Sequence, residues 1–212
     1  MKKISVSQCD SSPNPAIELR ALLGYDVLLL AWPKGAKGSP KKWKHLTVAN
    51  MTETYVRDLA GGNIGVALGA KSGHLVALDV DDDKLVQPFL DLNPFLKDTL
   101  QTHGDRGRVF WFRCSDNYPG KTKKLKGHAE EDCGEFRSNG SQSIIHGLHP
   151  YGKTYEIVHH AVPSTVAFAS IVWPKQISNP PTTGEPRFLD DLVKQSDGAM
   201  KAATSGSSDQ MT

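Results

Sequence analysis

Cysteine is scarce in this chain and is spaced in a way that excludes its usual structural uses. The three cysteines, Cys9, Cys114 and Cys133, are odd in number and widely separated, and none belongs to a Cys-x-x-Cys or Cys-His motif. A disulfide framework or a zinc site requires paired or clustered ligands. We therefore expect reduced thiols and no bound zinc.

Long apolar runs and nucleotide-binding loops are also missing. The longest apolar run, residues 27–32, is far shorter than the ~20 residues that cross a bilayer, and the N-terminus lacks the pattern of a secretion signal. No Walker-type phosphate loop, dinucleotide-binding glycine motif or internal repeat is present. We expect an intracellular protein that makes no use of a membrane.

The net charge is low, but the positive charges are clustered. The formal charge is only +2, so overall electrostatics alone do not point to a polyanionic partner. Two stretches nevertheless gather lysines in what we predict to be loops. These are Lys34, Lys37, Lys41, Lys42 and Lys44 in the first, and Lys121, Lys123, Lys124 and Lys126 in the second. Both clusters are candidates for phosphate contacts.

The length of 212 residues allows one well-buried domain with appendages. We expect the domain to cover residues 1–175, followed by a linker at 176–195 that contains a short helix at 188–194. The tail at 196–212, rich in Ser, Gly, Ala and Thr, is too polar to pack, and we expect it to be disordered. The polar end would fit a chain cut from a longer polypeptide.

Apolar periodicity and turn residues predict an α+β fold with mixed or antiparallel sheets and flanking helices. Helices are expected at 15–23, at 52–59 with Thr52 as the N-cap, and at 84–100 with an interruption or an end near Pro94. Residues 64–69 and 74–80 are expected to form a hairpin around a turn at 71–73. Further strands are predicted at 26–32, 108–113, 135–137, 142–145 and 154–158.

Two carboxylates follow the second strand of that hairpin. Successive side chains of a strand point to opposite faces, so Asp79 and Asp81 share a face. Paired carboxylates suit a hard cation such as Mg²⁺ or Mn²⁺, with substrate phosphate completing the shell. Glu135 on a later strand is the candidate third acid, and it makes a two-metal site geometrically feasible. Asp82 and Asp83 are expected to be solvated turn residues.

The order of several short motifs resembles the primase-polymerase branch of the archaeo-eukaryotic primase superfamily, which is encoded by phages, plasmids and integrated elements. Trp32-Pro33 with the first lysine cluster resembles the opening of those domains. Residues 63–69 and 75–81 are similar to the first catalytic motif, whose Asp-x-Asp falls on Asp79 and Asp81. Residues 140–155, with Gly-Leu-His-Pro and Gly-Lys-Thr-Tyr, resemble a later segment of phage-type relatives. The resemblance covers residues 25–160.

This resemblance implies a catalytic core of the RRM-like type and assigns roles to individual residues. Asp79, Asp81 and Glu135 would bind two divalent metals. A histidine is common in relatives on the strand after Asp-x-Asp, but Val109 stands there. Groups able to take over triphosphate binding are Arg106, Arg108, His149 and Lys153, and those expected to contact the template are Lys41, Lys42 and Lys44.

The function implied is that of a DNA primase or DNA polymerase, which joins nucleoside triphosphates on a single-stranded DNA template during replication of a phage or plasmid. The location implied is the cytoplasm of a bacterial or archaeal host, with a helicase domain in the parent polypeptide. Two alternatives stay open from the sequence. One is a catalytically impaired module that binds single-stranded DNA or an origin, which Val109 favours, and the other is a metal-dependent nuclease.

Overall fold

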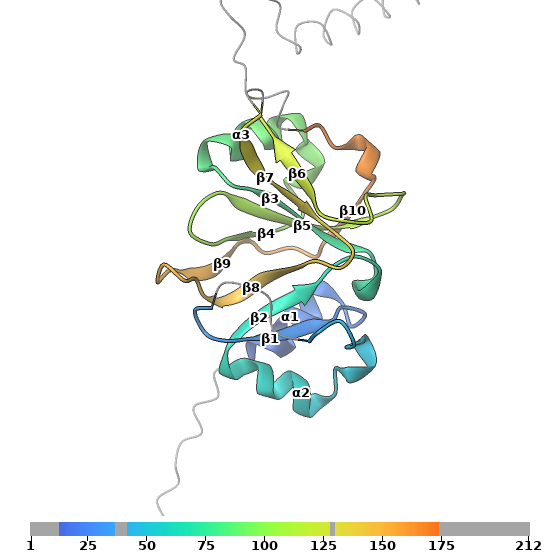
Figure 1. Cartoon of the computed structure of the whole chain (residues 1–212), viewed down its shortest axis with the longest axis vertical. Helices are drawn as coiled ribbons and strands as arrows, with labels where there is room; N and C mark the ends of the chain where they lie inside the picture. Colours follow the sequence, from blue (N-terminus) through green and yellow to red (C-terminus); the bar gives the residue numbers. More distant parts are fainter. Residues whose placement is uncertain (1–12, 37–41, 128–129, 174–212) are drawn as a thin grey trace, which may run out of the picture. The chain divides into compact units, whose positions relative to one another are not determined.

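The computed structural model describes residues 13–36, 42–127 and 130–173 (Figure 1). Within these ranges ten strands form one sheet in the order β1-β2-β8-β9-β4-β5-β3-β7-β6, with β10 beside β5. The strands are β1 Leu29–Trp32, β2 Asn63–Ala67, β3 Leu75–Val80, β4 Leu100–His103, β5 Arg108–Cys114, β6 Lys123–Lys126, β7 Asp132–Arg137, β8 Gln142–Leu148, β9 Thr154–His159 and β10 Ser164–Val166. The α-helices are α1 Pro15–Leu23, α2 Glu53–Asp58 and α3 Asp83–Leu92.

The pairing of the strands confirms the α+β prediction. Neighbours in the sheet order run antiparallel, whereas β10 runs parallel to β5. In Figure 1, α1 and α2 lie beside β1 and β2, and α3 lies beside β3 and β7. The helices therefore cover different parts of the sheet.

Strand β3 separates two hydrophobic cores by the alternation of its side chains. Leu75 and Ala77 belong to the core that also contains α1, α2, β1 and β2. Val76, Leu78 and Val80 belong to the second core, which packs against α3. Because alternate residues share a face, Asp79 continues the face of Leu75 and Ala77 beyond the point where the first core ends.

Local capping explains where the helices begin. The side chain of Asn14 accepts a hydrogen bond from the backbone N–H of Ala16 (2.9 Å) at the start of α1. Thr52 accepts one from the N–H of Tyr55 (3.3 Å) at the start of α2, which confirms the predicted N-cap. Asp82 caps α3 by accepting from the N–H of Lys84 (2.9 Å).

The third helix is shorter than the sequence predicted. Helix α3 ends at Leu92, and Pro94–Leu96 form a separate 3₁₀ turn. A proline disfavours helical conformation in the residue before it and donates no backbone hydrogen bond. The chain then enters strand β4 at Leu100, so the helix ends near Pro94, as the sequence allowed, rather than continuing after an interruption.

The predicted hairpin at residues 64–80 is also wrong. Strand β2 pairs with β1 and β8, β3 pairs with β5 and β7, and only a bridge between Gly69 and Leu75 links their ends. Gly69 has φ +80°, and the buried hydroxyl of Ser72 donates to the carbonyl of Ala67 (2.5 Å) and accepts from the N–H of Leu28 (3.0 Å). This fixed turn directs the two strands into different parts of the sheet.

Two more sequence predictions concern the later chain. Residues 123–126, predicted as loop, form strand β6 beside β7. The predicted linker, its helix at 188–194 and the tail lie outside the described residues. In the part of the chain that the structure describes, no helix has both the length and the apolar character required to cross a membrane.

Candidate active site

Three acidic residues lie where β3 runs beside β7. The register of the two strands places Asp79 directly opposite Glu135. The N–H of Asp81 donates to the carbonyl of Cys133 (2.9 Å), which extends the pairing one residue beyond β3. The sheet therefore delivers Asp79 and Glu135 side by side, with Asp81 two residues further along the same chain.

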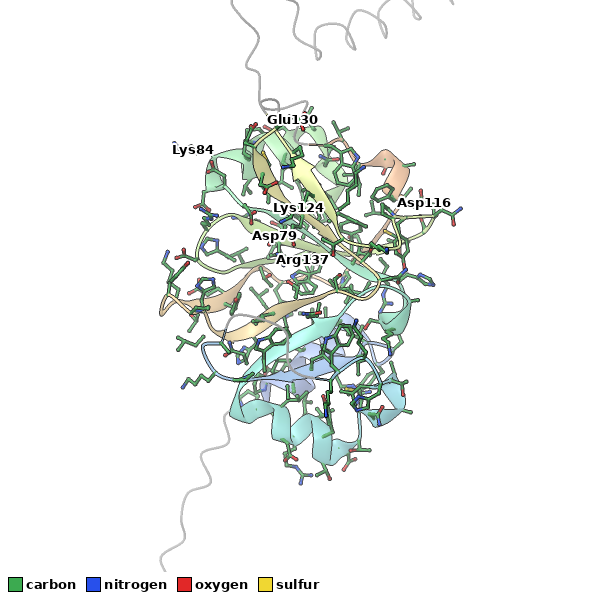
Figure 2. The ribbon with its side chains drawn as sticks, in the orientation of Figure 1. Asp79, Lys84, Asp116, Lys124, Glu130 and Arg137 are labelled. Atoms are coloured by element: carbon green, nitrogen blue, oxygen red, sulfur yellow. The ribbon has the colours of Figure 1, made fainter. Side chains whose placement is uncertain are left out.

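Arg137 holds these acids together. It donates from Nη2 to Oδ2 of Asp79 (2.7 Å), from Nε to Oε2 of Glu135 (2.9 Å) and from Nη1 to Oγ of Ser143 (3.0 Å). Lys124 on β6 forms an ion pair with the other oxygen of Glu135. Figure 2 shows Asp79, Arg137 and Lys124 gathered over the same strands. Cations of the chain itself thus neutralise the acidic pair.

Burial and charge shift the pKa of the two paired acids in opposite directions. Burial, reinforced by the nearby charges of Asp81 and Glu135, raises the pKa of Asp79 to about 6 against the opposing effect of Arg137. Burial also acts on Glu135, but hydrogen bonds from Lys124 and Arg137 outweigh it and hold the pKa of Glu135 below its ordinary value. Asp79 is the acid whose ionised form is costly here.

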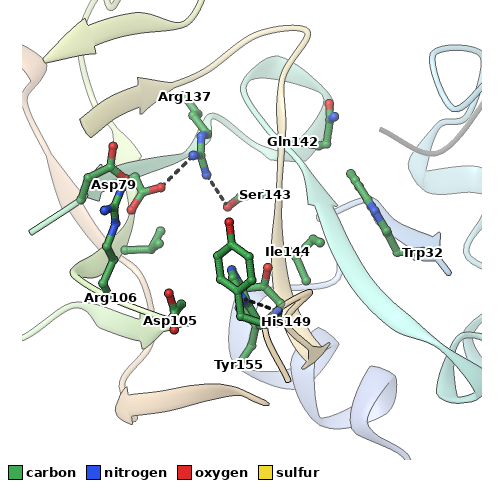
Figure 3. Close-up of a pocket in the computed structure, with 14 residues that line it drawn as sticks. Trp32, Asp79, Asp105, Arg106, Arg137, Gln142, Ser143, Ile144, His149 and Tyr155 are labelled. Carbon is green, nitrogen blue, oxygen red and sulfur yellow. Dashed lines mark hydrogen bonds and ion pairs between the residues drawn. The ribbon is translucent and has the colours of Figure 1, made fainter. Parts of the chain in front are cut away.

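A cavity of about 450 Å³ opens beside the acids. Its walls come from β1, β3, β5, β7, β8 and β9, from the residue after β3 and from the segments that precede β5 and β9. The lining residues are Trp32, Asp79, Asp81, Gly104, Asp105, Arg106, Val109, Arg137, Gln142, Ser143, Ile144, His149, Tyr151 and Tyr155. Figure 3 shows Arg137 reaching from Asp79 toward Ser143, with His149 and Tyr155 nearby.

A comparison with protein families identifies the chain. The model described as the N-terminal domain of bifunctional DNA primase/polymerase matches residues 11–179. The chain belongs to this family. Among curated proteins, no match is found. The family indicates DNA primase/polymerase activity of the nucleotidyltransferase type, and its model spans all the motifs at residues 25–160 that carried the resemblance.

The cavity of this primase-polymerase contains some of the residues that the sequence predicted to bind a nucleotide. Arg106 and His149 line it together with Asp79 and Asp81. Lys153 lies one contact away, because its ammonium group pairs with the carboxylate of Asp105 (3.0 Å), which does line the cavity. The structure therefore brings most of the predicted phosphate-binding groups to one place.

Arg108 lies elsewhere. It is opposite Val80 in the pairing of β3 with β5, whereas its neighbour Val109 is opposite Asp79. Opposed residues share a face of the sheet, so Arg108 lies on the α3 side, away from the carboxylates. It lines a different cavity with Gln101 and His159.

Val109 lies opposite Asp79, at the position where the resemblance led us to expect a histidine. It also lines the cavity. On another wall, the ring of His149 lies 5.1 Å from that of Tyr151 and 5.5 Å from that of Tyr155, measured between centroids. An imidazole is thus present in the cavity, but it comes from the turn between β8 and β9 rather than from β5.

The two lysine clusters differ in their surroundings. Lys42 and Lys44 are exposed, and Lys41 lies outside the described residues. In the second cluster, Lys124 pairs with Glu135, and Lys126 pairs with Asp132 (2.7 Å). Acids of the neighbouring strand β7 neutralise both of these lysines, which weakens the second cluster as a surface for phosphate.

Sequence reasoning missed the central residue of the site. It gave no role to Arg137, Ser143 or Tyr155, all of which line the cavity. The available signal was the alternation of β7, which places Glu135 and Arg137 on one face because they are two residues apart. A cation next to a predicted metal ligand is a candidate for the same site.

The acids fit a divalent cation by their chemistry. Carboxylate oxygens are preferred ligands of Mg²⁺ and Mn²⁺, and the contacts of Arg137 and Lys124 show that positive charge is accommodated beside Asp79 and Glu135. Across residues 13–36, 42–127 and 130–173, no three His, Cys, Asp or Glu side chains converge closely enough to enclose an ion by themselves. A bound metal would therefore need further ligands from substrate or water.

Proposed function

We propose that this chain is a template-dependent DNA primase or DNA polymerase that uses Mg²⁺ or Mn²⁺ to join nucleotides on single-stranded DNA. The observation that carries the proposal is that Asp79 lines a cavity and lies opposite Glu135 in the pairing of β3 with β7. Arg106 and His149 line the same cavity and supply groups that bind phosphate. Acids and cations around one space are the arrangement that a nucleotide and its metals require.

Different residues of the chain would bind the metals and the nucleotide. Asp79, Asp81 and Glu135 would hold the metals, which when bound neutralise the charge that develops during nucleotidyl transfer. Arg106, His149 and Lys153 would hold the triphosphate. Arg137 forms ion pairs with both Asp79 and Glu135, so it would orient these two carboxylates before substrate arrives.

The wider context follows from the same proposal. Lys41, Lys42 and Lys44 would contact the template backbone, since a cluster of lysines attracts phosphate without reading its sequence. The biological setting would be replication of a phage or plasmid. A helicase domain in the parent polypeptide would supply the single-stranded template.

A primer-extension and priming assay tests the proposal. Labelled nucleotides, single-stranded DNA and Mg²⁺ or Mn²⁺ are supplied to the wild-type chain and to Asp79→Ala, Asp81→Ala and Asp58→Ala. Asp58, exposed at the end of α2, is the matched control. Loss of metal ligation removes several kcal/mol of transition-state stabilisation, so the first two variants should lose about 100-fold or more. Equal activity in all variants, or cleavage of DNA without nucleotides, would contradict the proposal.

A second candidate is a DNA-binding module that has lost catalysis. The presence of Val109 opposite Asp79, on the cavity wall, favours it, because a valine cannot bind phosphate. In that case the wild-type chain binds single-stranded DNA but does not extend a primer, and Val109→His restores extension. If the wild-type chain extends primers and Val109→His does not increase the rate, the second candidate is excluded.

A further inference from the structure

A second cavity, of about 360 Å³, lies on the opposite face of the sheet from the catalytic carboxylates. The register of β3 and β5 fixes this placement, because Val109 lies opposite Asp79 whereas Arg108 lies opposite Val80 in the α3 core. Gln101 lies opposite both Phe110 and His159, which places these side chains on the α3 side as well. This space is therefore separate from the proposed nucleotide site.

Arg108 is the anchor of this second cavity. Its Nη1 donates to Oε1 of Gln101 (3.1 Å), and Gln101 is only 3% exposed. The amide nitrogen of Gln101 donates to the carbonyls of Leu96 (3.1 Å) and Lys97 (2.9 Å), so the oxygen that holds Arg108 is fixed in direction. A buried glutamine thus positions one edge of the guanidinium.

The charge of Arg108 is left uncompensated. Its Nε is buried and has no hydrogen-bond acceptor, and no carboxylate lies within ion-pair distance among the residues that the structure places. A partly buried cation without a counter-ion is energetically costly. An anion in the cavity would relieve that cost.

The other polar groups of the cavity favour an anion. Lys97 and His159 line it with Arg108, and its lining contains no carboxylate in the described ranges. Lys97 forms an ion pair with Asp91, whose Oδ1 lies 3.6 Å from the lysine nitrogen and also accepts from Gln87 (2.8 Å). Asp91 itself does not line the cavity, so it moderates the charge of Lys97 without filling the space.

We propose that this cavity binds a phosphate group. The planar guanidinium of Arg108 offers donors that match two phosphate oxygens, and Lys97 and Gln87 offer further N–H donors. The cavity volume lies at the low end of the range for ligand sites, which suits inorganic phosphate or a single backbone phosphate group. The phosphate comes either from a free anion or from the backbone of DNA that passes behind the catalytic face.

Nuclear magnetic resonance of the ¹⁵N-labelled full chain tests this proposal with inorganic phosphate as the probe, at ionic strength held constant with NaCl. The side-chain amide of Gln101 and the backbone amides of Lys97, Arg108 and His159 should shift and saturate. Arg108→Gln should weaken that response about tenfold or more, since a hydrogen bond to a charged group is lost. Arg57→Gln removes the same charge from an exposed position on α2, which packs in the other core, so it is the matched control and should leave the response unchanged.

The outcomes separate clearly. Arg108→Lys keeps the charge but loses the planar guanidinium, so it should bind phosphate with intermediate strength. This variant distinguishes a loss of phosphate binding from a folding defect in Arg108→Gln. An oligonucleotide without a terminal phosphate is then added to the phosphate-bound chain. If it reverses the shift of the Gln101 side-chain amide, the site binds DNA backbone; if the shift persists, the site binds a free anion. Shifts that do not saturate, or that are the same in Arg108→Gln, overturn the proposal. The phosphate titration does not measure primer extension, so it can fail or succeed independently of the catalytic proposal.

Discussion

Arg137 supplies the counter-charge to the acids of the proposed metal site. It is largely buried and bonded to Asp79 and Glu135, the acids proposed to bind metal. Arg137→Gln leaves two neighbouring carboxylates without their main counter-charge, so the unfolding free energy should fall by about 3 kcal/mol. Because the same acids would bind a divalent ion, Mg²⁺ should restore part of the loss. Urea unfolding with and without Mg²⁺ measures both effects.

The matched control for that experiment is Arg106→Gln. Arg106 is exposed and has no ion pair within the described ranges. Its replacement should change the unfolding free energy by no more than about 0.5 kcal/mol, with or without Mg²⁺. Equal stability of the two variants would show that Arg137 does not compensate the acids.

Asp79 should make stability depend on pH in a direction opposite to that of a typical acid. Its pKa rises from 3.8 to about 6 on folding. Between these values the folded state binds more protons than the unfolded state, so Asp79 lowers stability as pH increases and imposes its full cost above pH 6. Asp79→Asn lacks this cost.

We therefore expect the stability of Asp79→Asn relative to wild type to increase from pH 4 to pH 7 by up to about 3 kcal/mol. Urea unfolding of both proteins across this range measures the difference. A relative stability that is constant with pH would show that the carboxyl titrates normally.

Sequence reasoning at the scale of residues succeeded where only alternation mattered. Asp79 is followed two residues later by Asp81, and both line the cavity. The same rule failed to separate Arg106 from Arg108, which are also two residues apart. Gly107, between them, has φ +67° and precedes the first residue of β5, so the alternation does not extend across it. Only the structure shows that the two arginines face different cavities.

At the scale of elements, features set by local contacts were predictable and features set by distant partners were not. The start of α2 follows from the cap at Thr52, which needs only four residues. The separation of β2 from β3 depends on β8 and β5, which lie far along the chain. Strand β6 was missed because its lysines resemble a loop until Asp132 and Glu135 are placed beside them.

Gly134 tests how closely β3 and β7 must approach to position the acids. It has φ +146°, and a Cβ there would lie 1.8 Å from the carbonyl oxygen of Asp79. Gly134→Ala must therefore displace backbone, which should lower the unfolding free energy by about 1–3 kcal/mol and reduce primer extension. Urea unfolding and the extension assay measure the two effects.

Gly120→Ala is the control for this substitution. A Cβ at Gly120 meets nothing within 4 Å, and its φ is not in the left-handed region. We expect stability within about 0.5 kcal/mol of wild type and unchanged extension. Should Gly134→Ala behave like this control, the close approach of the strands would not position Asp79.

At the scale of the whole molecule, the site depends on how the sheet curls. Ser143 on β8 accepts from Arg137 on β7, although four strands separate β8 from β7 in the order of the sheet. Asn63 fastens β2 to the end of β8, since its side chain donates to the carbonyl of Leu148 (2.7 Å) and accepts from the N–H of that residue (2.7 Å). Strand order of this kind arises from long-range pairing, so the sequence indicated the acids but not the cavity around them.

The C-terminal end of the domain is held to the core by residues that follow β10. Asn93 holds the segment after β10, because its side chain donates to the carbonyl of Val172 (3.0 Å) and accepts from its N–H (2.8 Å). The ring of Trp173 lies 5.2 Å from that of Phe168 and 6.2 Å from that of Phe136, between centroids. These contacts join residues 168–173 to the α3 core.

We therefore expect two shortened chains to differ. A chain that ends at residue 175 keeps the contacts of Trp173 with Phe168 and Phe136 and should retain the stability and extension activity of the full chain, as the proposed domain boundary requires. A chain that ends at Val166 loses Phe168, Ile171 and Trp173 from the α3 core and should be less stable by about 3 kcal/mol or more. Urea unfolding of the three chains compares them. If both shortened chains lose stability equally, residues after 175 belong to the fold, and the boundary must move toward the C-terminus.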